Sequence, residues 1–195
     1  MRIQLNAMSI KVGLFGFFIL SLLLLSGCLN NDNVEDPISP EEFLEESIQK
    51  VDKTKLSSDL SVIDDSLVMW GLTPKVLKDS KEAVRYIIDE AGSVDAVKPT
   101  LSNIIKFKYT GKLLSTGEVF DTSENTTNKF VESYLYNLII GFQTTIPLLT
   151  NGTKATLYIP SGYGYGVTDR TNGAGVVVIP KNSNLIFEVE LLEVR

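Results

Sequence analysis

The last stretch of the chain, Asn184–Val194 with the sequence NLIFEVELLEV, decides the fold. Apolar residues occupy every second position from Leu185, and the residues between them mix Glu with Ile and Leu. Alternation with a period of two predicts a β-strand with one dry face and one partly wet face. Such a strand belongs to an antiparallel sheet, and its wholly apolar face must be covered by another layer.

Other stretches that alternate in the same way, or contain a turn signal, complete the predicted sheet. They are Glu82–Glu90, Ile104–Lys112, Phe130–Leu135 and Thr153–Ile159, with a tight turn at Ser115–Gly117 that leads into Glu118–Asp121. Apolar residues at helical spacing predict one short helix from about Ile140. The predicted fold class is α+β: a curved antiparallel β-sheet (a half-barrel) wrapped around one short helix, with a small helical N-terminal extension. Because one short helix cannot cover a wide sheet, we expect an apolar gap lined by aromatic residues.

Residues 1–27 have the features of a signal peptide. Arg2 and Lys11 form a basic lead, and the apolar core Val12–Leu25 is shorter than the ~20 residues of a membrane-spanning helix. The core ends in Leu25-Ser26-Gly27-Cys28, which resembles a bacterial lipobox and makes Cys28 the expected lipidation site. An uncleaved membrane anchor with a chance cysteine is the alternative. Both interpretations predict an exported, membrane-anchored protein.

Residues 28–40 predict a flexible tether that starts at lipidated Cys28, because they are polar and contain Pro37 and Pro40. No Asp follows Cys28 at the second mature position. This favours the outer over the inner membrane, with the protein on its periplasmic or surface face, if the cell has both membranes.

Residues 41–80 predict a helical N-terminal extension before the main domain at 81–195. The first helix begins at Pro40 with Ser39 as N-cap, and the second runs from about Ser58 to Trp70, where Gly71 ends it. Two interpretations are open: a dimerisation or docking arm, and a cap packed on the domain. The shortness of the segment favours the cap.

Composition excludes several kinds of site. The chain of 195 residues has no His, one Cys and a net charge of −6. A Ser-His-Asp triad, a His-ligated metal, a Cys-cluster metal site and an intrachain disulfide are therefore excluded, and no metal site is predicted. The acidic excess argues against a nucleic-acid partner, which selects basic surfaces.

Several motifs from about residue 101 to the C-terminus resemble the FKBP-type peptidyl-prolyl isomerase family, in the family's order and with near-family spacing. They are Tyr109–Leu113, Gly117–Ser123, Ile140–Phe142, Gly152–Ala155, Ile159–Ser161, Tyr163–Gly166, Ile179–Ser183 and the final strand. The helix at 58–70 and the strand at 82–90 also resemble exported lipoprotein members of this family. The resemblance implies a peptidyl-prolyl cis-trans isomerase of the cell envelope that acts on exported proteins.

The chemistry that the resemblance implies needs no cofactor, metal or nucleophile. The barrier to rotation about an amide is ~18–20 kcal/mol, because twisting destroys the resonance of the bond. The twisted amide has less charge separation than the planar one. A dry aromatic pocket therefore penalises the planar ground state more than the transition state.

By resemblance, four residues have catalytic roles: Asp121, Tyr165, Phe142 and Tyr109. Phe142 would be the floor of the pocket, where many relatives have Trp, and Tyr165 would donate its hydroxyl to a substrate carbonyl. Asp121 would act through its field, or a hydrogen bond, beside the rotating amide. The substrate-binding residues that the resemblance implies are Phe120, Phe130, Leu138, Ile139, Val178, Ile179 and Phe187, with a substrate carbonyl held by the Ile139 backbone N–H.

Each assignment has a plainer alternative. Tyr109 and Phe187 lie on core faces of their strands and could be ordinary packing, and Asp121 could cap a turn. Tyr165 lies between glycines, which favours a role for its hydroxyl or ring. The long loop Val167–Val178 would overhang the site, where it either sets substrate preference or obstructs access.

The expected partners are proline-containing polypeptide clients, and the membrane through the lipid on Cys28. Binding of macrolide inhibitors is left open. The alternative function is a non-catalytic chaperone or interaction module built on the same fold, because the motifs by themselves do not establish a rate.

Overall fold

The structure is a computed structural model that describes residues 37–94 and 96–195. The expected signal peptide, Cys28 and most of the expected tether lie outside the described residues. Residues 37–195 form one compact unit, so the predicted extension and the predicted domain belong to the same body. Within the described residues, no helix has the length and apolar character to cross a membrane.

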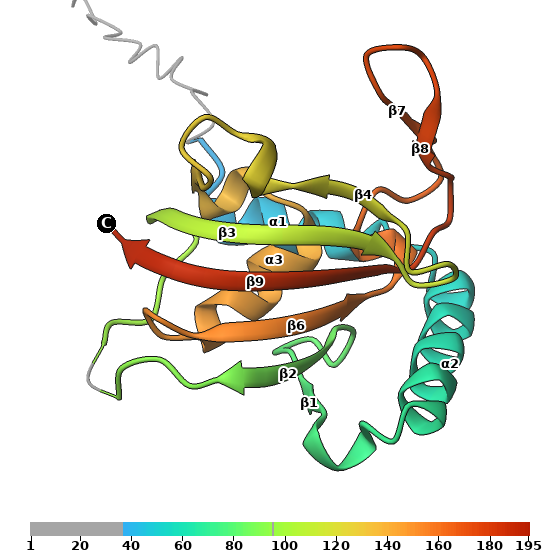
Figure 1. Ribbon diagram of the computed structural model, residues 1–195, viewed down its shortest axis with the longest axis horizontal. Coiled ribbons are helices and arrows are strands. Elements are labelled where there is room, and N and C mark those ends of the chain that lie inside the picture. Colours follow the sequence, from blue (N-terminus) through green and yellow to red (C-terminus); the bar gives the residue numbers. More distant parts are fainter. Residues whose placement is uncertain (1–36, 95) are drawn as a thin grey trace, which may run out of the picture. The chain divides into compact units, whose positions relative to one another are not determined.

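A seven-stranded antiparallel sheet dominates this unit (Figure 1). Its strands lie in the order β1-β2-β6-β9-β3-β4, and β5 also pairs with β3. The sheet is not closed into a barrel, which agrees with the predicted half-barrel. The strand bounds are β1 Leu77–Lys78, β2 Arg85–Glu90, β3 Ile104–Leu113, β4 Val119–Thr122, β5 Val131–Tyr134, β6 Lys154–Ile159 and β9 Leu185–Val194.

The C-terminal strand β9 lies at the centre of the sheet, between β6 and β3. Its Leu185, Phe187, Val189 and Leu191 side chains are all buried, which confirms the predicted dry face. Alternation predicts burial less accurately around β2. Val84 and Tyr86 are buried, but Ile88, which was predicted on the same side, is exposed. Ile88 lies where the ladder between β2 and β6 becomes irregular.

Two helices cover the dry face. The predicted short helix is α3 (Ile140–Thr145), and Gly141 lets it lie close to β6, because a Cβ there would approach the Ile159 side chain to 2.7 Å. Helix α1 (Pro40–Gln49) begins with the Ser39 cap as predicted. Its Leu44 and Ile48 belong to the same hydrophobic core as Phe142. The inner layer therefore contains α1 as well as the one helix predicted for it.

Helix α2 (Lys53–Met69) packs on the other side of the sheet, at one end. Ile63 and Leu67 contact a second hydrophobic cluster that contains Tyr158 of β6 and Ile87 of β2. This packing agrees with the cap interpretation of the extension. The helix begins at Lys53, after the Asp52 cap and five residues before the predicted start at Ser58, because its first turn is mostly polar and shows no apolar repeat.

The long loop after Tyr165 contains a small hairpin that stands away from the sheet (Figure 1). Strand β7 (Arg170–Thr171) pairs with β8 (Val177–Ile179) in a separate two-stranded sheet. Single 3₁₀ turns connect the other elements: η1 Thr73–Lys75, η2 Ser123–Asn125, η3 Leu135–Asn137, η4 Ile146–Leu148 and η5 Ser161–Tyr163.

Candidate active site

An apolar pocket opens at the dry face of the sheet, beside the start of α3. It has a volume of about 130 Å³. Aromatic side chains from strands β3 and β9, helix α3 and the loop after η5 meet there. The lining residues are Phe107, Tyr109, Val131, Leu138, Ile139, Phe142, Tyr165 and Phe187. The structure therefore brings together six of the predicted site residues on one recess.

Phe142 lies at the centre of the aromatic cluster and is 4% exposed. Its ring centroid lies 4.9 Å from that of Phe187 and 5.8 Å from that of Phe107, both edge to face. Such pairs add ~0.5–1.5 kcal/mol each beyond the burial of their area. The ring that was predicted as a floor is thus held on two sides, and it is both core and pocket lining.

Tyr109 and Asp121 form a polar link beside the pocket. The Tyr109 hydroxyl donates to Asp121 Oδ2 at 2.6 Å, and the Thr122 N–H donates to Asp121 Oδ1 at 2.8 Å. Burial, and then the bond to Asp121, raises the pKa of Tyr109 well above its usual value. Asp121 does not line the pocket itself, and its carboxylate is connected to the lining through the hydrogen bond from Tyr109.

Tyr165 faces the pocket from the loop that follows η5. Its hydroxyl has no hydrogen-bond partner in the described part of the chain. Burial raises the pKa of Tyr165, Asp121 adds to the increase, and Arg170 opposes it. The Arg170 guanidinium lies 5.0 Å from the centre of the Tyr165 ring. At neutral pH Tyr165 is therefore a protonated donor that a ligand can engage.

The rim of the pocket depends on a residue that the sequence analysis missed. Gln143 of α3 is buried, and its Nε2 donates to the Leu138 carbonyl at 2.6 Å and to the Tyr136 carbonyl at 3.1 Å. These bonds fix the segment that carries Leu138 and Ile139. The Ile139 backbone N–H donates to no acceptor among the described residues, so it is available to a ligand.

Four predicted substrate-binding residues lie outside the lining. Phe120 packs its ring against Phe187 at 5.6 Å and supports the wall from behind. The Phe130 ring instead lies under the Lys106 ammonium, 4.0 Å away. Ile179 of β8 belongs to the hydrophobic core cluster, and the partly buried Val178 packs against this cluster. Phe107 and Val131, which were not predicted as site residues, line the pocket instead. Phe107 could have been predicted from the sequence, because it lies on the same strand face as Tyr109.

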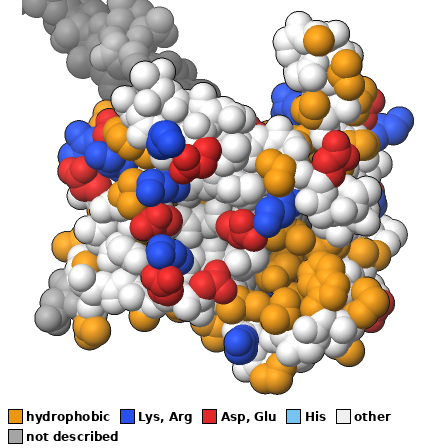
Figure 2. Space-filling view, viewed as in Figure 1, with side chains coloured by type: hydrophobic (Ala, Val, Ile, Leu, Met, Phe, Trp, Pro, Cys, Tyr) orange, Lys and Arg blue, Asp and Glu red, His pale blue; other side chains and the backbone are white. Residues whose placement is uncertain are grey.

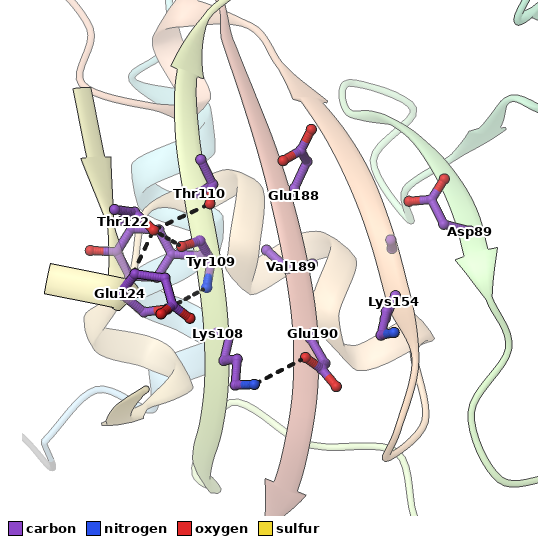
Figure 3. A pocket seen from close by; sticks show the side chains of 12 residues that line it. Asp89, Lys108, Tyr109, Thr110, Thr122, Glu124, Lys154, Glu188, Val189 and Glu190 are labelled. Atoms are coloured by element: carbon purple, nitrogen blue, oxygen red, sulfur yellow. Dashed lines mark hydrogen bonds and ion pairs between the residues drawn. The ribbon is translucent and has the colours of Figure 1, made fainter. Parts of the chain in front are cut away.

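A larger groove of about 280 Å³ lies on the opposite face of the sheet (Figure 3). Half of its twelve lining residues are charged, and Figure 3 shows the ion pair between Lys108 and Glu190 across neighbouring strands. Lys154, which also lines the groove, pairs with Glu90 at 2.9 Å. With six charged residues in its lining and Tyr109 as its one aromatic residue, this groove is a solvated strand surface and not a site for an apolar ligand.

Among the described residues, no group of His, Cys, Asp or Glu side chains could hold a metal ion. The pocket offers apolar walls, one free hydroxyl and one free N–H. Such a site can bind a small apolar ring and hold the carbonyl groups on either side of it.

A comparison with protein families places the chain. The sequence model of the FKBP_C family, described as FKBP-type peptidyl-prolyl cis-trans isomerase, matches residues 95–192. The chain belongs to this family. The match includes every residue that lines the pocket, so the family's domain and the candidate site coincide.

Individual relatives agree with this assignment. The chain is 38% identical over 121 residues to a probable FKBP-type peptidyl-prolyl cis-trans isomerase of Haemophilus influenzae, covering 62% of this chain and 46% of the relative. It is 37% identical over 100 residues to FK506-binding protein 2 of Kluyveromyces lactis, covering 51% and 68%. It is also 34% identical over 121 residues to the isomerase FkpA of Escherichia coli, covering 62% and 41%. The matches thus span less than half of each bacterial relative.

The fold has a solved counterpart. A crystal structure of a peptidyl-prolyl cis-trans isomerase from Pseudomonas syringae matches with a TM-score of 0.58 and 22% sequence identity. The match covers 73% of this chain and 94% of the other. At this identity the likeness supports the fold: an α+β architecture whose antiparallel sheet is wrapped around a short helix.

Proposed function

We propose that the chain is a peptidyl-prolyl cis-trans isomerase of the cell envelope, which accelerates rotation about Xaa-Pro bonds in exported proteins. The observation that carries this proposal is the convergence of Tyr109, Phe142, Tyr165 and Phe187 on one open apolar recess. Its volume of about 130 Å³ is below the ~300–1,000 Å³ of pockets for drug-sized ligands, and it suits a single small ring.

The pocket residues act by holding the peptide and excluding water. The proline ring enters the recess over Phe142, while the Tyr165 hydroxyl and the Ile139 N–H bind the carbonyls on either side. The rotating amide then lies beside aromatic walls and near the Asp121–Tyr109 pair. The less polar, twisted amide is disfavoured less by these walls than the planar amide, so the barrier falls.

The cellular setting is part of the proposal. Cleavage before Cys28 and lipidation of its thiol would anchor the domain to a membrane by a tether of residues 28–40, outside or at the edge of the described part of the chain. Proline-containing exported polypeptides would be the clients. Binding of macrolide inhibitors, which the resemblance leaves open, is not part of the proposal.

A protease-coupled peptide assay tests the proposal on a soluble form of the chain that starts at Leu29. The protease cleaves a chromogenic Xaa-Pro peptide only in the trans form, so the slow phase reports isomerisation. The chain should accelerate this phase, and Tyr165→Phe should lower kcat/KM about fivefold, the worth of one hydrogen bond of ~1 kcal/mol. If the slow phase has the same rate with and without the chain, the proposal is contradicted.

A control variant distinguishes the loss of the Tyr165 hydroxyl at the pocket from the loss of a tyrosine hydroxyl elsewhere in the chain. Tyr134 of β5 is exposed and stacks its ring on Tyr136 at 5.1 Å, away from the pocket. Tyr134→Phe should therefore retain the full kcat/KM. An equal loss in Tyr134→Phe and Tyr165→Phe would contradict the assigned role of Tyr165.

One observation favours a second function, that of a chaperone. Hydrophobic side chains gather over α2 and the neighbouring part of the sheet (Figure 2). Val68, Met69 and Trp70 at the end of α2 are exposed, and Leu77 of β1 is exposed beyond them. Large exposed apolar surfaces mark interaction sites on soluble domains. Such a surface could hold apolar segments of an unfolded client while the pocket acts on its prolines.

Aggregation of an unfolded, proline-free client tests this second function. The double variant Met69→Ser with Trp70→Ser should suppress aggregation less than the unaltered chain, and its peptide isomerase rate should be unchanged. If the double variant protects as well as the unaltered chain, the apolar surface is not a client site.

A further inference from the structure

The turn that carries Tyr165 is held by a helix that contributes nothing to the pocket lining. Asp59 of α2 is 2% exposed. Its Oδ2 accepts hydrogen bonds from the Ser161 N–H at 3.1 Å and from the Ser161 hydroxyl at 2.6 Å. Its other oxygen pairs with the Lys55 ammonium. The Asp59 carboxylate, 102 residues earlier in the chain, thus holds the first residue of η5 with one oxygen and Lys55 with the other.

Ser161 in turn holds both neighbours of Tyr165. Its carbonyl accepts from the Gly164 N–H at 3.1 Å and from the Gly166 N–H at 2.8 Å. The Gly166 carbonyl accepts from the Asn182 N–H at 2.7 Å, which closes the base of the long loop. A continuous series of hydrogen bonds therefore runs from Asp59 through Ser161 to the backbone on either side of Tyr165.

The same turn is also pressed against the junction of α1 and α2. A Cβ on Gly162 would lie 2.7 Å from Val51 Cγ1, so only glycine permits this approach. The helices therefore contact two consecutive residues of η5, Ser161 by hydrogen bonds and Gly162 by packing. Without these contacts, the loop between β6 and β8 would have fewer restraints where it carries a pocket residue.

We propose that Asp59 is a positioning residue for the isomerase reaction, which fixes the Tyr165 hydroxyl at the pocket through Ser161. This inference rests on the proposed function and extends it to the helical extension. Burying a carboxylate costs free energy that apolar packing in its place would not. A role in fixing a local geometry explains why a charge lies there, since α2 already docks through Ile63 and Leu67.

The test measures kcat/KM for the Xaa-Pro peptide in the soluble form that contains residues 29–195. Asp59→Ala should lower it about fourfold, which corresponds to ~0.8 kcal/mol and stays below the fivefold loss expected when the Tyr165 hydroxyl itself is removed. Ser161→Ala removes one of the two bonds and should have a smaller effect in the same direction. The matched control is Asp65→Ala, an exposed acid on the same helix, which should leave kcat/KM unchanged.

A double-mutant cycle distinguishes positioning from general loss of stability. In a Tyr165→Phe background, the hydroxyl that Asp59 positions is absent, so Asp59→Ala should change kcat/KM less than about twofold. The same fold-loss in both backgrounds would overturn the proposal. If Asp59→Ala does not fold, the same cycle is measured with Ser161→Ala in its place, because this variant leaves the Asp59–Lys55 pair intact.

Amide hydrogen exchange at Gly164 and Gly166 gives a readout that does not depend on activity. Both amides should exchange faster in Asp59→Ala and Ser161→Ala, and at the original rate in Asp65→Ala. Unchanged exchange at both glycines overturns the inference whatever the kinetics. If the unaltered chain proves inactive, the proposed function fails, and the exchange rates still decide whether Asp59 holds the turn.

Discussion

At the scale of single residues, the site consists of rings that pack and hydroxyls that stay protonated. Phe142 and Phe187 are buried in the core and line the pocket at the same time. The Tyr109 hydroxyl donates a hydrogen bond to Asp121, whereas the Tyr165 hydroxyl has no acceptor among the described residues and can donate to a ligand. With no His in the chain, these hydroxyls and the backbone N–H groups are the proton donors around the recess.

The tyrosine hydroxyls predict a pH-independent rate in the neutral range. Burial is the first cause that raises the pKa of both Tyr109 and Tyr165, so both keep their protons well above pH 9. We expect kcat/KM to be constant from pH 6 to about 9. A titration with a midpoint inside that range, in protein shown by circular dichroism to be folded, would contradict this assignment of donors.

A third buried tyrosine, Tyr163, predicts a loss of stability at alkaline pH. Burial, followed by Asp79 and Glu45, raises the pKa of Tyr163 to about 12, against ~10 in the unfolded chain. A raised folded-state pKa gives stability that is complete below about pH 10 and is lost as pH rises through about 12. Urea unfolding between pH 9 and 12 should show this decrease, and Tyr163→Phe should reduce its size.

The sequence was informative about residues wherever a strand face or a family motif fixed them. Alternation placed Tyr109 and Phe187 on core faces, and the family resemblance implied the roles of these two residues and of Tyr165 in the site. Gln143 and Asp59 could not be found in this way, because a buried polar residue is identified by its partners. Those partners lie on the Tyr136–Leu138 segment and at Ser161, which only the folded chain brings near.

At the scale of elements, helix α2 is attached to the sheet by a buried cation. The Arg85 side chain of β2 is 7% exposed, and its Nε and Nη2 donate to the two carboxylate oxygens of Asp64 at 2.7 and 2.8 Å. The third nitrogen donates to the Glu82 carbonyl at 2.8 Å. All three guanidinium nitrogens are thus used inside the fold.

Removing the acid should therefore weaken the attachment of α2. Asp64→Ala leaves the Arg85 guanidinium without its carboxylate, and we expect the free energy of unfolding to fall by ~2 kcal/mol, the worth of hydrogen bonds to a charged group. Equilibrium urea unfolding measures the change. Asp65→Ala, one residue further along α2 and exposed, should leave stability within ~0.5 kcal/mol of the original value.

The β7–β8 hairpin predicts a preference among substrates. Arg170 lies over the Tyr165 ring, and none of the described carboxylates lies within 4.0 Å of its guanidinium, so a client acid near the proline would meet an available cation. Arg170→Ala should lower kcat/KM for peptides with Glu beside the Xaa-Pro unit more than for peptides with Lys there. If Arg170→Ala leaves the ratio of kcat/KM for the two peptides unchanged, the hairpin does not select substrates by charge.

Element predictions succeeded where one period dominated the sequence. The strand β9 and the helix α3 have the predicted type and nearly the predicted bounds. Helix α2 begins five residues before its predicted start, because its first turn is mostly polar and shows no apolar repeat. The two-residue strands β1 and β7 were not predicted, since two residues are too few to show any period.

At the scale of the whole molecule, the described unit holds the predicted extension and the family domain in one body. The extension supplies Leu44 and Ile48 to the core and Asp59 to the turn before Tyr165. The sequence predicted the two regions separately, because the pattern within a helix does not show which surface it will cover. The predicted half-barrel is confirmed as an antiparallel sheet that is not closed into a barrel, and an apolar recess lies on its dry face.

Anchoring through Cys28 gives a prediction for the full chain in a bacterial host. The unaltered chain should sediment with membranes and become labelled when cells grow with a radioactive fatty acid. Cys28→Ser removes the thiol that receives the lipid, so labelling should be lost. Labelling that persists in Cys28→Ser would contradict the lipobox assignment, and an unlabelled chain that stays in membranes would favour the uncleaved anchor.

The central claim is that a proline ring enters the recess over Phe142. Intermolecular nuclear Overhauser effects between an Xaa-Pro peptide in exchange and the soluble chain test it most directly. The account predicts contacts from the proline ring protons to the aromatic protons of Phe142, Tyr109 and Phe187, under conditions where the chain accelerates cis-trans exchange. Accelerated exchange with proline contacts elsewhere, or with none to these three rings, would contradict it.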